Sequence, residues 1–159
     1  MSLYDWLLFL HVFAAFAWVA ALVLYTVIIA AAWRLDVPSE VVRMFRVSRV
    51  GDALIAVGMI GTIVFGIWLA LDVDEYEIWD GWIIAALILW LVALALGGQV
   101  GKIYNGARDR ANALVAEGRD APSPELSAML RSQRGLVLHG LMILVVLLLL
   151  IDMIYKPGA

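Results

Sequence analysis

The sequence contains no cysteine, which excludes disulfides, thiolate-bound metal ions, iron–sulfur clusters and cysteine nucleophiles. Charged residues are also scarce, at 16% of the chain against about 25% in soluble domains. The net charge is −3, and no basic tract occurs outside the connections between apolar runs, which argues against a nucleic-acid partner. Phosphate-binding, nucleophile-elbow and zinc-helix motifs are missing as well, so redox chemistry, transport or a non-catalytic role remain.

Apolar residues make up 65% of the chain and gather in four long runs. About 20 apolar residues are enough to cross a bilayer as a helix. The runs predict a single transmembrane domain over residues 1–159, all-α, with four transmembrane helices in an antiparallel up-down bundle. The expected helices cover about 5–33, 41–71, 81–116 and 135–155. The first run has no basic residue before it and is too long for a signal peptide, so we expect it to stay in the mature protein.

The connections between the runs differ in charge. The connections over 34–50 and 102–134 carry four and six Lys or Arg residues, whereas the acidic connection over 72–80 carries none and the C-terminal tail carries only Lys156. Basic residues are retained on the cytoplasmic side of membrane proteins. The pattern therefore predicts an inner-membrane protein whose first and third connections are cytoplasmic and whose N- and C-termini both lie outside the cytoplasm.

A few polar side chains fall within the predicted spans, where such residues are rare and often functional. The predicted topology sorts them into two layers. The outer layer contains His11 and Asp152, and the inner layer contains Asp52, Gln99 and His139. Because the two histidines lie in opposite leaflets, we expect that they do not bind one metal ion together.

His11 allows two interpretations. In the first, its neutral imidazole forms a hydrogen bond across the bundle to Asp152, to a tyrosine or to a backbone carbonyl. In the second, it is an axial ligand of haem, which requires a histidine in an apolar bundle with room for a flat macrocycle. The spacing of residues alone favours the first interpretation.

Other polar or sulfur-containing side chains have simpler explanations. His139 lies one turn inside the membrane boundary, where it can pair with Asp52. Met59 and Met142 are candidate thioether ligands, although methionine in a helical core usually fills space. The glycines of the second apolar run predict close packing of that helix near the centre of the bundle.

The stretch LHVFAAFAWVAALVLY places His11 and Trp18 seven residues apart. It resembles the first helix of a superfamily of small membrane proteins, which includes the copper-resistance D-type proteins, the HemJ-type protoporphyrinogen IX oxidases and a branch of predicted integral membrane proteins. The resemblance implies that His11, with Trp18 nearby, binds haem b. The chain has Val27, Ile84 and Ala86 where the HemJ-type enzymes carry basic residues. Those differences argue against oxidase activity.

Three functions follow as hypotheses. The first is a small inner-membrane protein that binds b-type haem through His11 in a redox role. The second is a non-catalytic accessory or scaffolding subunit of a larger membrane complex or a homo-oligomer, suggested by the glycine-rich second run. The third is proton or cation transport, suggested by the pairing of Asp52 with His139 and of His11 with Asp152. The expected partners are the lipid bilayer and a membrane protein or second copy, and no catalytic residue is assigned.

Overall fold

The structure is a computed structural model that describes residues 2–73 and 76–157, so Asp74 and Glu75 of the acidic connection lie outside the described residues. The described residues form helices and no strands, which confirms the predicted all-α class. The helices are α1 (Leu3–Ala32), α2 (Pro38–Arg46), α3 (Ser48–Asp72), α4 (Gly81–Ala116), α5 (Pro124–Leu130) and α6 (Gln133–Tyr155). The spans that include α1, α3, α4 and α6 are long and apolar enough to cross a membrane, as expected.

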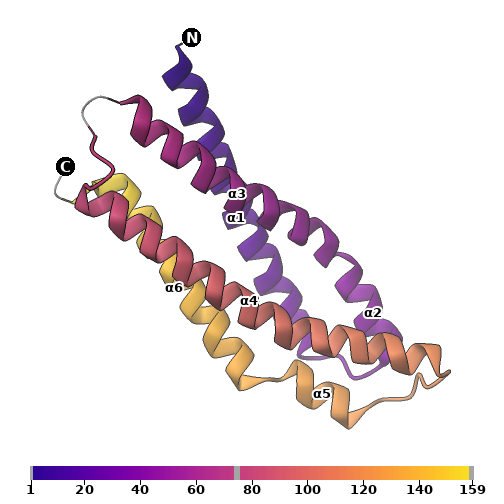
Figure 1. Cartoon of the computed structure of the whole chain (residues 1–159). Helices are drawn as coiled ribbons and strands as arrows, with labels where there is room; N and C mark the ends of the chain where they lie inside the picture. The colour runs from indigo at the N-terminus through magenta and orange to yellow at the C-terminus, as the bar shows by residue number, and fades with distance from the viewer. Residues whose placement is uncertain (1, 74–75, 158–159) are drawn as a thin grey trace.

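The four long helices form two antiparallel pairs. α1 packs along α3, and α4 packs along α6, whereas α1 touches α6 over a much shorter stretch. Both termini and the connection between α3 and α4 lie at one end of the bundle, and α2 and α5 lie at the other (Figure 1). We call the first the open end and the second the closed end.

The closed end holds the largest buried core. It combines side chains from four helices, α1, α2, α4 and α5, which are Ile28, Ile29, Ala32, Val41, Phe45, Val100, Tyr104, Ala107, Ala111, Leu126 and Leu130. α4 has 36 residues and is about 54 Å long at 1.5 Å per residue, which exceeds the hydrocarbon core of a bilayer. Its C-terminal turns pack against α2 and α5. Arg110 of α4 donates two hydrogen bonds, of 3.1 and 2.9 Å, to Glu125 of α5. The two helix pairs are therefore joined mainly at this end.

The predicted helix over 41–71 is wrong in one respect, because the helix is interrupted at Val47. α2 ends one residue before this turn and α3 begins one residue after it. The hydroxyl of Ser48 donates to the carbonyl of Phe45 at 2.7 Å, and such a bond competes with the helical backbone pattern. α2 can then turn its buried Phe45 toward α4 while α3 continues along α1.

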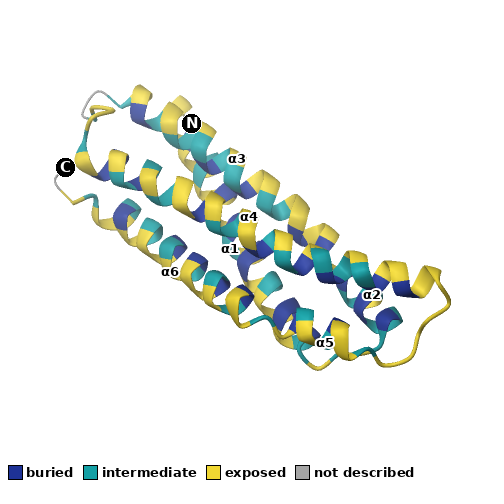
Figure 2. Ribbon diagram, turned by 60° about the horizontal axis from the view of Figure 1, so that its bottom comes forward, coloured by how far each residue is buried: buried dark blue, intermediate teal, exposed yellow. Residues whose placement is uncertain are grey.

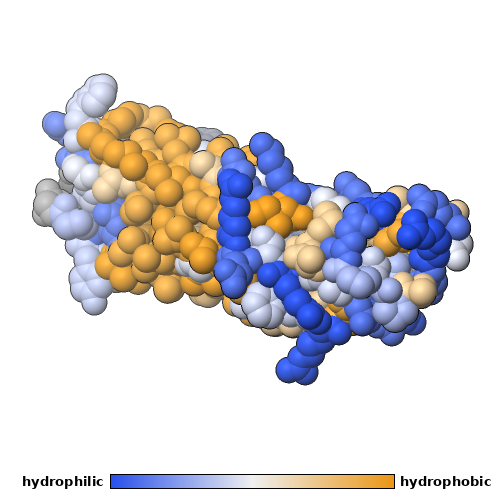
Figure 3. Space-filling model, turned by 90° about the horizontal axis from the view of Figure 1, so that it is seen from below, coloured by the Kyte–Doolittle hydropathy of each residue, from blue (hydrophilic) through white to orange (hydrophobic). Residues whose placement is uncertain are grey.

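Much of the exterior of the bundle is apolar. Buried residues follow the facing sides of the helices, and exposed residues follow the outer sides (Figure 2). Many of the exposed residues are large and hydrophobic, among them Phe16 at 69% exposed and Ile60 at 63%. On the face shown in Figure 3, an apolar surface extends over the half of the bundle toward the open end as far as a hydrophilic rim, and hydrophilic side chains project from the half toward the closed end. Such a surface suits lipid contact rather than water.

Candidate functional site

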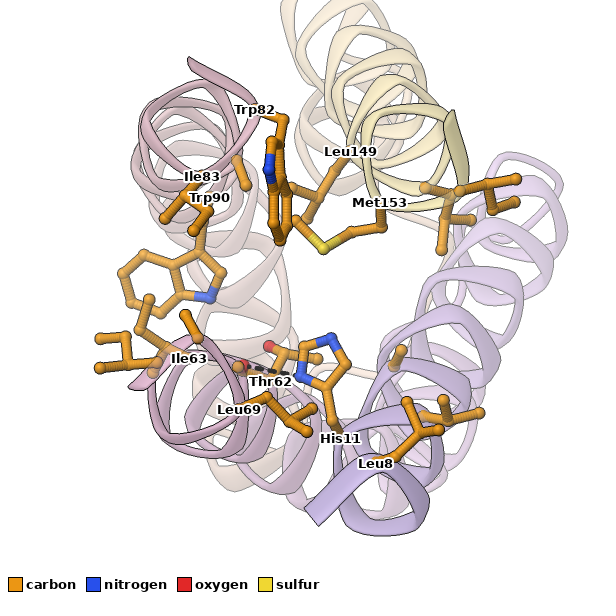
Figure 4. A pocket seen from close by; sticks show the side chains of 18 of the residues that line it. Leu8, His11, Thr62, Ile63, Leu69, Trp82, Ile83, Trp90, Leu149 and Met153 are labelled. Carbon is orange, nitrogen blue, oxygen red and sulfur yellow. Dashed lines mark hydrogen bonds between the residues drawn. The ribbon is translucent and has the colours of Figure 1, made fainter. Parts of the chain in front are cut away.

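A cavity of about 530 Å³ lies between the two helix pairs toward the open end. All four long helices contribute to its wall, and Figure 4 shows that α1 and α3 face α4 and α6 across it. The lining is predominantly apolar, with His11 and Lys156 as side chains that can carry a positive charge. Small-molecule and cofactor sites commonly have volumes of about 300–1,000 Å³ and this mixture of apolar wall and few polar groups.

His11 projects from α1 into this cavity (Figure 4). Its Nδ1 lies 3.1 Å from the backbone carbonyl oxygen of Thr62 in α3. A carbonyl only accepts hydrogen bonds, so Nδ1 carries the proton and donates it. The hydroxyl of Thr62 donates within its own helix, to the carbonyl of Gly58 at 2.8 Å. Nε2 is then the unprotonated nitrogen, and it faces the cavity (Figure 4).

The position of the imidazole depends on Gly66 of α3. A Cβ atom added there would lie 2.9 Å from Cε1 of His11. That contact is shorter than real side chains allow, so any larger residue would push the ring out of place. Gly66 therefore makes room for the imidazole beside α3.

Three tryptophans line the cavity, and two of them, Trp18 and Trp82, are almost fully buried. Trp18, two turns beyond His11 along α1, is 4% exposed and packs with Met142 and Val146 of α6 at the inner end. Trp82, at the start of α4, is 6% exposed and lies on the opposite side of the cavity from His11 (Figure 4). The structure thus brings Trp18 to the same cavity as His11, although deeper in the bundle.

Lys156 lies at the mouth of the cavity, where it follows the last residue of α6 in a left-handed conformation with φ of 41°. Its ammonium group donates a hydrogen bond to the hydroxyl of Tyr76 and stands 4.5 Å from the centre of that ring. It also lies 5.3 Å from the centre of the Trp82 ring, within the range of a cation–π interaction. A positive charge therefore sits at the entrance to an apolar cavity.

The two residues of the predicted outer layer, His11 and Asp152, have different surroundings in the structure. His11 has the carbonyl of Thr62 as its partner in place of Asp152. Asp152 is 8% exposed, lies outside the cavity lining, and its Oδ2 has no hydrogen-bond partner among the described residues. Of the expected alternatives for His11, the backbone carbonyl is the one the structure contains.

The residues of the predicted inner layer also have separate surroundings. Nε2 of His139 lies 2.8 Å from Oγ1 of Thr26, and the Thr26 hydroxyl donates to the carbonyl of Leu22 at 2.8 Å, so the imidazole donates to the hydroxyl. Asp52 instead accepts a hydrogen bond from Tyr25. Gln99 is exposed on the surface of α4. The transport hypothesis requires a continuous polar path across the bundle. Among the described residues, these separate bonds do not form one.

Some residues of the cavity were absent from the candidates drawn from the sequence. The carbonyl of Thr62 and the close approach of Gly66 depend on how α3 is rotated against α1, which the apolar pattern does not show. Met153 lines the cavity, whereas the two methionines proposed from the sequence do not. Met142 and Met59 belong to the packed cluster below it.

The described residues contain no group of three or more His, Cys, Asp or Glu side chains that could hold a metal ion on their own. In the comparison with protein families, residues 5–157 match a family described as "Predicted integral membrane protein (DUF2269)". Neither the curated proteins nor the solved structures include one that matches the chain.

Proposed function

The chain belongs to the DUF2269 family of predicted integral membrane proteins, and we propose that its cavity binds a b-type haem through Nε2 of His11. The observation that carries this proposal is the orientation of the imidazole. Its Nδ1 is engaged by the carbonyl of Thr62, and its Nε2 faces an apolar cavity. Histidine ligands of metals typically donate their second ring N–H to such an acceptor, which fixes the tautomer and the direction of the ring.

The rest of the cavity is consistent with a flat, largely apolar group. Its volume of about 530 Å³ lies between helix pairs rather than within one pair, so a planar molecule can stand with a helix pair on each face. The aromatic and aliphatic walls exclude water and lower the local polarity, and both factors influence the reduction potential of a bound haem. A haem held in this way would supply one-electron transfer within the membrane.

We further propose that the open end faces away from the cytoplasm. Ten of the eleven Lys and Arg residues belong to the segments that form the closed end, and Lys156 is the one at the open end. Because basic segments are usually retained in the cytoplasm, this distribution favours a closed end inside the cell and a cavity in the outer half of an inner membrane.

The direct test is a spectrum of the purified protein after haem has been supplied during expression. The wild-type protein should show the bands of a b-type haem in a reduced-minus-oxidised difference spectrum. His11→Gly should lose them, and free imidazole should restore them by entering the space that the side chain leaves. His139→Asn is the matched control, because this second histidine lies outside the cavity lining. A folded wild-type protein without these bands would overturn the proposal.

A further inference from the structure

Met153 of α6 projects into the cavity from the wall opposite His11. Figure 4 shows its sulfur and the Nε2 side of the imidazole directed toward the same central space from opposite sides. Both residues line the cavity, and the side chain of Met153 is partly buried against Ala70, Trp82 and Ile83. A thioether sulfur is thus available on the face of the cavity that His11 does not occupy.

The register of α1 against α6 places the two residues at the same depth. The hydrogen bond of 2.8 Å between Thr26 and His139 fixes one level of the bundle. From Thr26 toward the open end, His11 is 15 residues along α1, and from His139 toward the open end, Met153 is 14 residues along α6. At 1.5 Å per residue these paths are about 22 Å and about 21 Å. A second level agrees, because Trp18 packs in one cluster with Val146.

The opposite directions of α1 and α6 are compatible with this register. Side chains on an α-helix lean toward its N-terminus. α1 begins at the open end and α6 begins at the closed end (Figure 1), so His11 leans outward and Met153 leans inward. The hydrogen bond between Thr26 and His139 joins two side chains that lean in these same two directions, so the residue count from that bond compares the depths of the side-chain ends.

Methionine often does no more than fill gaps in a core. Met142 illustrates this role, since it is 8% exposed and packed within the cluster around Trp18. Met153 differs because its sulfur borders open space and faces a histidine nitrogen. Packing alone does not explain that placement.

We propose that Sδ of Met153 is the second axial ligand of the haem that His11 binds. This inference rests on the proposed function and adds the sixth ligand to it. Histidine and methionine together are an established axial pair for haem iron, and the methionine raises the reduction potential. The site then suits electron transfer rather than the binding of a small molecule at the iron, because both axial positions are occupied.

The test compares Met153→Leu with Met142→Leu in the haem-loaded protein. Leucine keeps the volume of methionine and removes the sulfur, and Met142 supplies a matched control outside the cavity lining. The wild type and the control should show a six-coordinate low-spin haem that binds carbon monoxide slowly. Met153→Leu should become five-coordinate and high-spin, bind carbon monoxide rapidly after reduction, and have a lower reduction potential. Met153→His should return the haem to six-coordinate low spin at a potential below that of the wild type.

The outcomes separate this inference from the haem proposal itself. If the wild type binds haem through His11 and Met153→Leu keeps the wild-type spin state and potential, the methionine is not a ligand and the haem proposal stands. If the folded wild type takes up no haem, both proposals fail together.

Discussion

Gly58 of α3 lies directly against the backbone of Trp18 in α1. A Cβ atom added to Gly58 would come within 2.6 Å of both the backbone nitrogen and Cβ of Trp18. The missing side chain therefore allows the two helices to approach at the level just below the cavity, in the way that small residues permit close packing of membrane helices.

We expect Gly58→Ala to destabilise the protein, because the added methyl group must push α1 and α3 apart. Overpacking of this kind costs about 1–3 kcal/mol. Gly98→Ala is the matched control, since a Cβ at Gly98 meets no atom within 4 Å and a helical alanine is favoured over glycine by about 0.5–1 kcal/mol. Denaturation by SDS in mixed micelles measures both. Equal stability of the two variants would contradict the close contact.

The hydrogen bond between Thr26 and His139 joins the two helix pairs, so Thr26→Val should loosen that connection. The change preserves shape and leaves Nε2 of His139 without its partner. Its Nδ1 is already unpartnered among the described residues, so both ring nitrogens of a side chain that is 4% exposed would lack bonds. Bonds of this kind between membrane helices contribute about 0.6 kcal/mol on average and up to about 1.7.

Thr26→Ser is the control for that variant, because serine retains the hydroxyl. The same denaturation experiment should place it near the wild type and place Thr26→Val below it. A double-mutant cycle with His139→Asn isolates the pairwise energy, which should vanish once either partner is removed. Additive effects of the two substitutions would show that the bond contributes nothing.

The absence of native cysteine makes the proposed orientation directly testable. Glu77→Cys introduces a thiol in the exposed connection at the open end, and Glu117→Cys introduces one just after α4 at the closed end. In intact cells, a maleimide that does not cross membranes should label the first variant and leave the second unlabelled. Permeabilised cells should label both. The reverse pattern in intact cells would invert the topology.

The fold class was predictable from the sequence because four apolar runs separated by charged connections allow few arrangements in a bilayer. The length of each span and the bundle class depend only on composition along the chain. The break at Val47 was not predictable in the same way. It depends on a serine hydroxyl that competes for the carbonyl of Phe45 and on the packing of α2 against α4, a contact between distant segments.

The site was predictable in part. His11 was a candidate because an ionisable side chain within a membrane span is costly and is often functional. Its partner was not evident, since α3 presents the carbonyl of Thr62 only at one rotation against α1. Met153 was missed although a signal existed. In an antiparallel bundle, residues near the start of the first helix and near the end of the last lie at one depth, and this places Met153 rather than Met142 level with His11.

The final prediction concerns Lys156 at the mouth of the cavity. Haem has one edge with two carboxylates, and burying them unpaired in an apolar cavity is costly, so that edge should face the mouth and its cation. We expect Lys156→Gln to weaken haem binding by about fivefold to tenfold, the range for a partly exposed charged hydrogen bond. Binding of haem dimethyl ester, which lacks both charges, should not change.

Titration of haem and of its ester into apoprotein in detergent measures this difference, and Lys102→Gln at the exposed surface of α4 is the matched control. Loss of affinity for both ligands in Lys156→Gln would instead indicate that the lysine matters through its contacts with Tyr76 and Trp82, which hold the mouth in shape. Unchanged affinity for haem would place the carboxylate edge elsewhere. The two ligands share their macrocycle and iron and differ only at the carboxylate edge. A loss of affinity for haem but not for its ester would therefore show that the carboxylate edge faces the charge of Lys156.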